Sequence, residues 1–306
     1  MIAFLYPGQA SQYVGMLKDL VETYPVAAEM VEQADEILDF DLKNICFNGP
    51  EDKLKQTYIT QPAIFVHSCV ATRLLADSGI KPDFVAGHSL GEYSSLVAAG
   101  AIEFLDALKL VKIRGDAMQK AGEIQPGTMA AIIGMDDENV AKLCAAASDA
   151  GIVTPANFNS PGQIVISGSL EGIAKAVEIA AEFGAKRAVP LVVGGAFHSP
   201  LMESAGQSLK EAIHTSSFKN AHVPVYSNVK AEPVQDAEEI KELLEQQLTS
   251  PVLWSQSMEN MVRDGAETFY EVGPQRVLAG LLRRIDRKKR VKGVDTVEDL
   301  NNLSAN

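Results

Sequence analysis

The chain has 306 residues, of which 46% are hydrophobic and 22% charged, and its formal net charge is −13 at pH 7. The composition is that of a globular protein, and the acidic balance argues against nucleic acid as the main partner, because phosphate binding needs a basic surface. Three widely spaced cysteines, with neither a basic leader nor an apolar run of membrane length, predict a soluble, cytoplasmic protein without a disulfide framework or metal site.

Apolar and amphipathic segments alternate over residues 1–125. IAFLY (2–6) and DFVAG (83–87) predict two buried strands. Helices are expected over residues 27–38, 61–79, 91–100 and 104–122. The second of these helices has Pro62 in its expected first turn. Alternating strands and helices are typical of a parallel, doubly wound sheet, so we expect an α/β-hydrolase-like fold here.

Residues 126–194 show a different order of elements. The pattern predicts strand, helix, strand, strand, helix and strand, at residues 128–135, 137–151, 152–158, 162–169, 170–184 and 186–193. This βαββαβ order is the ferredoxin-like pattern. We therefore expect a small ferredoxin-like subdomain at 126–194, inserted into a large α/β catalytic subdomain that residues 1–125 and 195–306 form.

The C-terminal part returns to the α/β rhythm. Helices are expected at 201–214 and near 236–248, and VPVYSNV (223–229) is strand-like. TFYEVG (268–273) is expected to be the last strand, and RRIDRKKRVK (283–292) is a strongly basic tail.

Ser89 lies in the stretch GHSLG (87–91), between the strand that ends there and the helix that follows. Gly-x-Ser-x-Gly at such a junction is the nucleophile-elbow pattern, in which a sharp turn exposes the serine at a helix N-terminus. Glycine-rich turns between strands and helices are common, so these five residues alone also fit a structural turn. The apolar strand before the serine and the helix after it favour a nucleophile.

A nucleophilic serine needs a base, and the chain has five histidines. His67 lies in an apolar helix and is expected in the core, and two others lie in polar stretches. His88 is adjacent to Ser89, and neighbouring side chains on a turn point apart. His198 follows an apolar strand in GGAFHSP, a loop of the kind where sites of α/β folds gather. It is the best candidate base, with a histidine that caps a helix as the alternative.

A series of motifs in this order resembles the malonyl-CoA:acyl carrier protein transacylases of fatty acid synthesis and the related acyltransferase domains of polyketide synthases. The motifs are YPGQASQYVGM (6–16), TQPAIF (60–65), GHSLGEYS (87–94), KIRGDAMQ (112–119), MAAIIG (129–134), NFNSPGQIVISG (157–168), GAFHSPLM (195–202), SPVLW (250–254) and YEVGP (270–274). They span nearly the whole chain, and the ferredoxin-like insertion agrees with the small subdomain of that family.

The resemblance implies a catalytic role for several matching positions. Ser89 would take the malonyl group as an ester, with His198 as its base. The group that orients His198 would be a backbone carbonyl, that of Gln247, rather than a carboxylate. The backbone amides of Gln9 and Leu90 would form the oxyanion hole. Leu90 directly follows the nucleophile, which is where the elbow geometry places one of the two amides.

Arg114 and Phe197 are implied in substrate selection. From the sequence alone, Arg114 fits a solvated arginine on a helix. The resemblance makes it the partner of the malonyl carboxylate, which a guanidinium fork binds by two charged hydrogen bonds. Phe197 resembles the malonyl-selective form of its motif, where the ring would crowd an α-methyl branch, and core packing is its alternative.

The sequence departs from the family at one loop. The usual pattern Gly-Gln-Gly-Ser-Gln is present here as GQASQ (8–12), with Ala10 at the central position. If this position needs a positive φ, alanine is strained by roughly 1 kcal/mol or more, whereas a negative φ costs nothing.

The expected reaction is a ping-pong transfer of malonyl from malonyl-CoA, through Ser89, to the phosphopantetheine thiol of holo acyl carrier protein. No cofactor, metal or membrane is expected to take part, and a monomer is the default. The alternatives are a serine esterase or thioesterase of the α/β-hydrolase type, a trans-acting polyketide synthase acyltransferase, and a non-catalytic module that binds carrier protein. The basic segment 283–292, with Lys186 and Arg187, is a candidate docking surface or a solvated face.

Overall fold

The computed structural model describes residues 1–304, which contain two sheets. The larger sheet consists, in spatial order, of β10 (Val291–Val294), β9 (Thr268–Val272), β1 (Ile2–Tyr6), β2 (Phe84–Gly87), β7 (Val225–Tyr226) and β8 (Pro233–Val234). All neighbours are parallel except β7 and β8, which are antiparallel. Central strands such as β1 are buried on both faces, which explains their continuous apolar sequence. The predicted α/β class with a mainly parallel sheet is confirmed.

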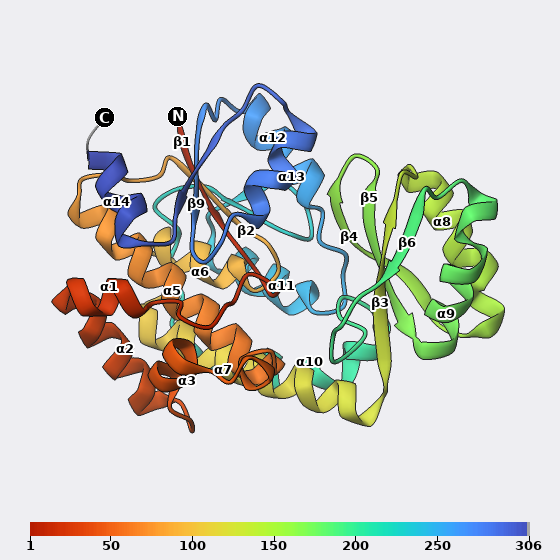
Figure 1. The fold of residues 1–306 in the computed structure, drawn as a ribbon, viewed down its shortest axis with the longest axis horizontal. Coiled ribbons are helices and arrows are strands. Elements are labelled where there is room, and N and C mark those ends of the chain that lie inside the picture. Colours follow the sequence, from red (N-terminus) through yellow and green to blue (C-terminus); the bar gives the residue numbers. More distant parts are fainter. Residues whose placement is uncertain (305–306) are drawn as a thin grey trace.

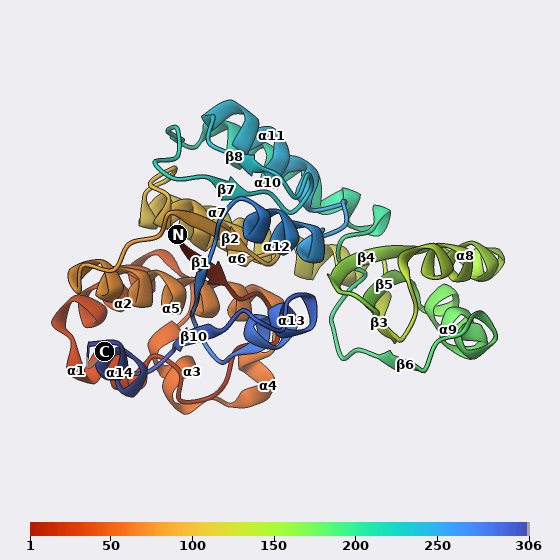
Figure 2. The same ribbon diagram turned by 90° about the horizontal axis from the view of Figure 1, so that it is seen from above.

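Helices cover both faces of this sheet (Figures 1 and 2). They are α1 (Lys18–Thr23), α2 (Pro25–Ile37), α3 (Leu42–Asn48), α4 (Glu51–Leu54), α5 (Thr57–Asp77), α6 (Gly91–Ala98), α7 (Phe104–Ile124), α10 (Glu203–Thr215), α11 (Ala237–Gln247), α12 (Trp254–Arg263), α13 (Val277–Ile285) and α14 (Val297–Ser304). Within the described chain, none of the helices is long and apolar enough to cross a membrane.

The start of α5 differs from the prediction. The helix begins at Thr57, so Pro62 lies inside it rather than in its first turn. The first turn, Thr57 to Thr60, is polar and β-branched and carries little helical signal in the sequence. Its side chains are nevertheless largely buried, and the hydroxyl of Thr60 donates to the carbonyl of Leu54. Tertiary packing thus extends the helix beyond what its local sequence favours.

The smaller sheet forms a separate lobe, on the right of Figure 1. Its antiparallel strands lie in the order β4 (Val153–Ser160), β5 (Gln163–Ser169), β3 (Gly127–Ile133) and β6 (Arg187–Pro190). Two helices, α8 (Asp137–Ala147) and α9 (Leu170–Ile179), pack on it and enclose a core of their own. The predicted ferredoxin-like order of elements is present, although β6 ends at Pro190, earlier than expected.

The two lobes are joined by backbone hydrogen bonds beside the cavity described below. Val252 donates from its N–H to the carbonyl of Ala156 (2.8 Å), and its own carbonyl accepts from the N–H of Phe158 (2.9 Å). Asn157 pairs with Val252 as an isolated parallel bridge. The edge of the small sheet is therefore attached to the segment that follows α11.

The basic segment at 283–292 is not a tail, which corrects the prediction. It comprises the last turn of α13, a turn and the start of β10, so TFYEVG is not the last strand. Arg283 and Arg284 lie exposed on the outer side of α13, while Leu281 and Leu282 face the core. Lys292 is an exposed lysine on an edge strand, where charge prevents pairing with other chains. The many basic residues of this segment hide the short apolar patterns of the end of α13 and the start of β10 in the sequence.

Candidate active site

Ser89 lies at the sharp turn between β2 and α6. Its φ is 51°, a left-handed conformation that lifts the side chain away from the chain. The two flanking glycines are required by close approach of other backbone. A Cβ on Gly87 would lie 1.9 Å from the carbonyl carbon of Gly91, and a Cβ on Gly91 would lie 2.1 Å from the carbonyl oxygen of Tyr6. The sequence thus builds the elbow where the sheet and the helix are closest.

His198 lies directly against this serine. Its Nε2 is 2.7 Å from Ser89 Oγ, although the two residues are far apart in the sequence. Its Nδ1 is 3.0 Å from the carbonyl oxygen of Gln247 and 3.2 Å from that of Ser250. Since both oxygens are acceptors, Nδ1 carries the hydrogen and Nε2 is left to accept from the Ser89 hydroxyl. The histidine is therefore oriented by backbone carbonyls rather than by a carboxylate.

The imidazole is held in its neutral form. His198 is 4% exposed, and burial, with the charge of Arg114 as the second cause, lowers its pKa to about 3. Near neutral pH the ring is free to accept a proton, as a general base must be.

Arg114 comes from α7 and is buried, with 1% of its surface exposed, so the surface-arginine alternative is wrong. Its Nη1 donates to Gln61 Oε1 (2.7 Å), and its Nη2 donates to Ser89 Oγ (2.9 Å) and to Gln247 Oε1 (3.0 Å). The guanidinium also lies 5.6 Å from the ring centre of Tyr93. Among the described residues, Arg114 Nε has no acceptor, so the buried cation keeps donors for an anionic ligand.

These groups converge on one cavity of about 140 Å³. Its lining comprises Gln9, Ala10, Gln61, His88, Ser89, Leu90, Arg114, Met118, Met129, Asn157, Leu191, Val193, Phe197 and His198. Within residues 1–304, the backbone N–H groups of Gln9 and Leu90 donate to no protein acceptor. Both are free to bind an oxyanion beside the serine. Phe197 lines the cavity and also belongs to the hydrophobic core, so it does pack there, while its contact with substrate stays a prediction.

The loop that carries Gln9 is strained at Ala10. The φ of Ala10 is 82°, in the region that favours glycine, so the strained case considered for the sequence applies. Two hydrogen bonds hold the loop, from the Ala10 N–H to Gln12 Oε1 (2.9 Å) and from Ser11 Oγ to the carbonyl of Gly8 (2.8 Å). The conformation that places Gln9 at the cavity therefore persists without the glycine.

Three further polar residues support the site and were not singled out from the sequence. Asn228 accepts from the N–H of Ser89 and donates to the carbonyl of Gly87, both at 2.7 Å. Gln61 and Glu92 are almost completely buried and hydrogen-bond to Arg114 and Gln247, respectively. All three have polar neighbours in the sequence, so no local pattern identifies them.

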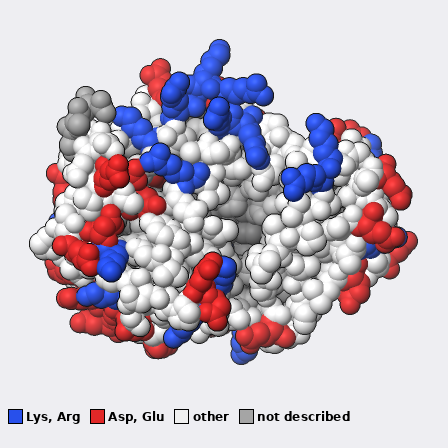
Figure 3. Space-filling model, in the orientation of Figure 1, with Lys and Arg blue, Asp and Glu red and all other residues white. Residues whose placement is uncertain are grey.

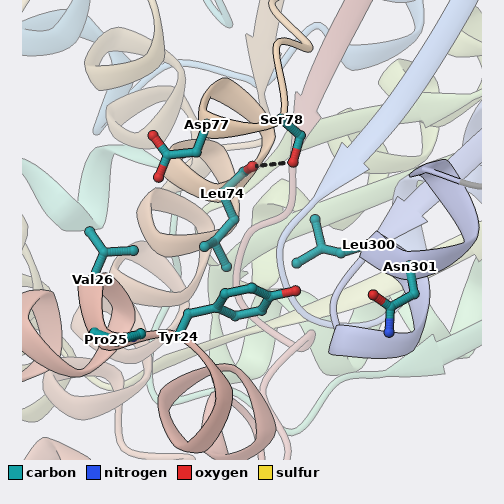
Figure 4. A pocket seen from close by; sticks show the side chains of 8 residues that line it. All are labelled: Tyr24, Pro25, Val26, Leu74, Asp77, Ser78, Leu300 and Asn301. Atoms are coloured by element: carbon teal, nitrogen blue, oxygen red, sulfur yellow. Dashed lines mark hydrogen bonds between the residues drawn. The ribbon is translucent and has the colours of Figure 1, made fainter.

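A larger hollow of about 290 Å³ lies elsewhere, between α2, the end of α5 and α14 (Figure 4). It is lined by Tyr24, Pro25, Val26, Leu74, Asp77, Ser78, Leu300 and Asn301. The hydrogen bond drawn there runs from Ser78 Oγ to the carbonyl of Leu74, at 2.9 Å. It stabilises the C-terminal end of α5. A paired nucleophile and base occur at Ser89, which makes the smaller cavity the candidate active site.

Comparisons with known proteins identify the family of the chain. Residues 3–300 match the family model described as an acyl transferase domain. The malonyl CoA-acyl carrier protein transacylase of Bacillus subtilis (strain 168) is 45% identical over 300 residues, which cover 98% of this chain and 95% of that protein. The solved transacylase of the same name from Coxiella burnetii has a TM-score of 0.95 at 39% identity, covering 99% and 96% of the two chains. A solved malonyl-transacylase in complex with its type II PKS acyl-carrier protein has a TM-score of 0.95 at 39% identity, covering 100% and 99%.

Proposed function

The chain belongs to the acyl transferase domain family, and on that premise we propose that it transfers malonyl from malonyl-CoA to acyl carrier protein. The observation that carries the proposal is that Ser89 Oγ lies 2.7 Å from a neutral histidine and 2.9 Å from a buried guanidinium. A malonyl group has a thioester carbonyl and a carboxylate separated by one methylene. Its two ends match these two neighbouring groups, because the serine attacks the carbonyl while Arg114 binds the carboxylate.

The first half-reaction forms the ester. His198 Nε2 takes the hydroxyl proton of Ser89 as Oγ attacks the thioester carbonyl. The N–H groups of Gln9 and Leu90 stabilise the oxyanion that forms. When the intermediate collapses, the carbon–sulfur bond breaks, and the departing CoA thiolate takes the proton from His198.

The second half-reaction reverses these roles. The phosphopantetheine thiol of the carrier gives its proton to His198 and attacks the malonyl ester. The carbon–oxygen bond to Ser89 then breaks, and the proton returns to Oγ. The proposal needs no cofactor or metal, because side chains and backbone amides supply the nucleophile, the base, the oxyanion donors and the carboxylate-binding cation. All of these groups come from one chain, so we infer a monomer. We also infer that it acts in the cytoplasm.

The hydrolase alternative is disfavoured by the relatives and by the site. The Bacillus subtilis relative is a transacylase, and an esterase of the α/β-hydrolase type would orient its histidine with a carboxylate. A buried arginine against the nucleophile also has little use unless the acyl group carries an anion.

We further infer that the carrier docks at the mouth between the two lobes. The basic cluster, defined as Arg283, Arg284, Arg287, Lys288, Lys289, Arg290 and Lys292, lies on α13, the following turn and β10. Arg284 lines a hollow together with Lys186 from the smaller lobe. Figure 3 shows basic side chains along the upper rim of the hollow between the lobes, while acidic side chains lie at its lower edge and toward the periphery. Positive charge at this position suits an acidic carrier protein on an otherwise acidic enzyme.

Intact-protein mass spectrometry tests the transfer. Malonyl-CoA should add one malonyl group to the protein, and holo acyl carrier protein should then remove it and become malonylated. Ser89→Ala should form no adduct, whereas Ser204→Ala, at an exposed position on α10, should behave as the wild type. Absence of a wild-type adduct, or release of free malonate faster than transfer to the carrier, contradicts the proposal.

A further inference from the structure

Glu92 is a buried carboxyl group that the reaction described above does not use. It lies on α6, three residues after the nucleophile, and is 3% exposed. Its Oε2 accepts a hydrogen bond from Gln247 Nε2 at 2.7 Å, and its Oε1 accepts a long one from the N–H of Asn228 at 3.4 Å. Both partners are amides rather than cations. A buried carboxylate in such surroundings is expensive unless a positive charge lies near it.

Gln247 connects this carboxyl group to Arg114. Its side-chain Oε1 accepts from Arg114 Nη2 at 3.0 Å, while its Nε2 donates to Glu92 Oε2 and to the carbonyl of Ser89, the latter at 2.9 Å. The amide oxygen therefore faces the cation and the amide nitrogen faces the carboxyl group. The side chain of Gln247 is 1% exposed and cannot turn over without breaking these bonds. Arg114 and Glu92 thus form a charge pair separated by one aligned amide.

Few other charges act on Glu92. Burial raises its pKa to about 7, and the hydrogen bonds from Gln247 and Asn228 and the charge of Arg114 oppose that rise. The ionisable groups that face it are Arg114 from α7 and Tyr93 from α6, and burial raises the pKa of Tyr93 to about 12. In the described chain, β1, β2 and α5, which also pack against α6, contribute no charge that acts on it. Arg114 is therefore the charged group that acts on Glu92, beside the larger effects of burial and of the two hydrogen bonds.

We propose that Glu92 is a positioning residue that balances the charge of Arg114 through Gln247 while the acyl pocket is empty, and that it takes up a proton from solvent when a substrate carboxylate binds Arg114. The inference rests on the proposed function, since it takes malonyl as the ligand of Arg114. Above about pH 7, where Glu92 is ionised, one carboxylate enters and one proton follows, so the net charge of the buried site is unchanged. The amide of Gln247 stays in place and keeps Arg114 aimed at the serine.

The sign of the pH effect follows from linkage. A bound carboxylate removes the stabilising positive charge from Glu92 and raises the pKa of Glu92, so malonyl binding is coupled to proton uptake. By reciprocity, malonyl binds better where Glu92 is already protonated, below about pH 7, and less well where it is ionised. Burial lowers the pKa of both His88 and His198, which disfavours the charged form of either ring.

The test compares malonyl-CoA with acetyl-CoA, because acetyl lacks the carboxylate but uses the same serine and histidine. The measured quantity is the ratio of kcat/KM for the two donors, from rapid-quench formation of the acyl-enzyme between pH 6 and 8.5. Effects of pH on Ser89, His198 and the CoA thiol cancel in this ratio. In the wild type, the ratio should fall about fivefold or more as the pH rises.

Glu92→Gln keeps the size of the side chain and the contact with Gln247 but cannot ionise. Its ratio should be independent of pH and should stay at or above the low-pH value of the wild type. Glu271→Gln is the matched control. Glu271 is also fully buried with a pKa raised to about 7, but it accepts its hydrogen bonds from the backbone N–H groups of Leu278 and Ala279 at the start of α13. That variant should keep the pH dependence of the wild type.

Three results separate the hypotheses. If the wild-type ratio does not change with pH although the malonyl-enzyme forms, Glu92 does not balance Arg114 and the inference is overturned. If Glu92→Gln lowers kcat equally for both donors and keeps the slope of the ratio, the role of Glu92 is only structural, which also overturns it. If malonyl-CoA forms no adduct at all, the proposed function itself fails. The wild-type profile needs no variant, so unfolding of Glu92→Gln leaves the test decisive.

Discussion

In the proposed function, the charge of Arg114 is the feature that distinguishes a malonyl site from a general acyl site. Replacing it with alanine removes the only guanidinium that hydrogen-bonds Ser89 in the described structure. We expect the kcat/KM ratio of malonyl-CoA to acetyl-CoA to fall by about 100-fold, because a lost charged pair in a buried site costs roughly 2–5 kcal/mol. An acyl-CoA panel with mass detection of the acyl-enzyme measures this. Arg73→Ala, at an exposed position on α5, is the control, and an unchanged ratio in Arg114→Ala would refute the assignment.

Ala10 stores strain beside the proposed oxyanion hole. Ala10→Gly should raise the free energy of unfolding by about 0.5–1 kcal/mol, because relief of the positive φ outweighs the greater freedom of glycine in the unfolded chain. Urea denaturation measures the change. Ala141→Gly, in the interior of α8 and exposed, should instead lose about 1 kcal/mol. A loss of stability in both variants would show that the loop is not strained.

The site residues differ in how far the sequence alone identifies them. Ser89 is marked by its own neighbours, since the glycines of the elbow are local, and His198 follows by elimination. Arg114 has the pattern of a surface residue, and only the family resemblance gives it a role. Glu92 and Asn228 act through contacts with residues 136 to 155 positions away, and no local pattern encodes such partners.

At the scale of elements, the contact of α6 with β1 positions the elbow. Gly91→Ala would place a Cβ 2.1 Å from the Tyr6 carbonyl oxygen and force the helix away from the strand. We expect a loss of about 2–3 kcal/mol in the free energy of unfolding, because an overpacked core costs this much, and a lower kcat, because Leu90 shifts with the helix. Thermal or urea unfolding and acyl-enzyme formation measure the two effects.

Gly206→Ala is the matched control for that substitution. Gly206 lies in α10, and an added Cβ would have nothing within 4 Å. It should raise stability by up to about 1 kcal/mol, as alanine favours a helix over glycine. If the two variants lose stability equally, close packing at the elbow is not the cause.

Elements with a strong hydrophobic period were predicted well, and those with a weak or masked period were not. β1, β2 and α7 have clear apolar patterns and lie within two residues of their expected ends. The first turn of α5 is helical because its buried surroundings stabilise it, and β10 is short and interrupted by charge. In both cases tertiary contacts decide the structure, and a single sequence does not contain them.

At the scale of the whole molecule, charge is distributed unevenly on an acidic protein. Reversing Arg287 and Lys288, two exposed members of the basic cluster, to glutamate should raise KM for the carrier protein about threefold to tenfold. KM for malonyl-CoA should not change, because in the proposed function Ser89 and Arg114 bind the malonyl group within the cavity. Steady-state kinetics at low and high salt measure both constants, and the difference should shrink with salt.

The control for charge itself is Lys53→Glu, an exposed position on α4 outside the cluster. It changes the net charge in the same direction and should leave KM for the carrier nearly unchanged. Equal increases in KM for carrier and for malonyl-CoA in the cluster variant would reject docking at this surface.

The low basicity of His198 also bears on which acceptor takes the acyl group. Burial and the charge of Arg114 make the imidazole a weak base with a pKa of about 3. Proton transfer to such a base is moderately unfavourable from a thiol, whose pKa is about 8.5, and far more unfavourable from water, whose pKa is about 15.7. A thiol therefore gives up its proton to His198 more readily than water does, which favours transfer of the acyl group to the carrier over hydrolysis of the Ser89 ester.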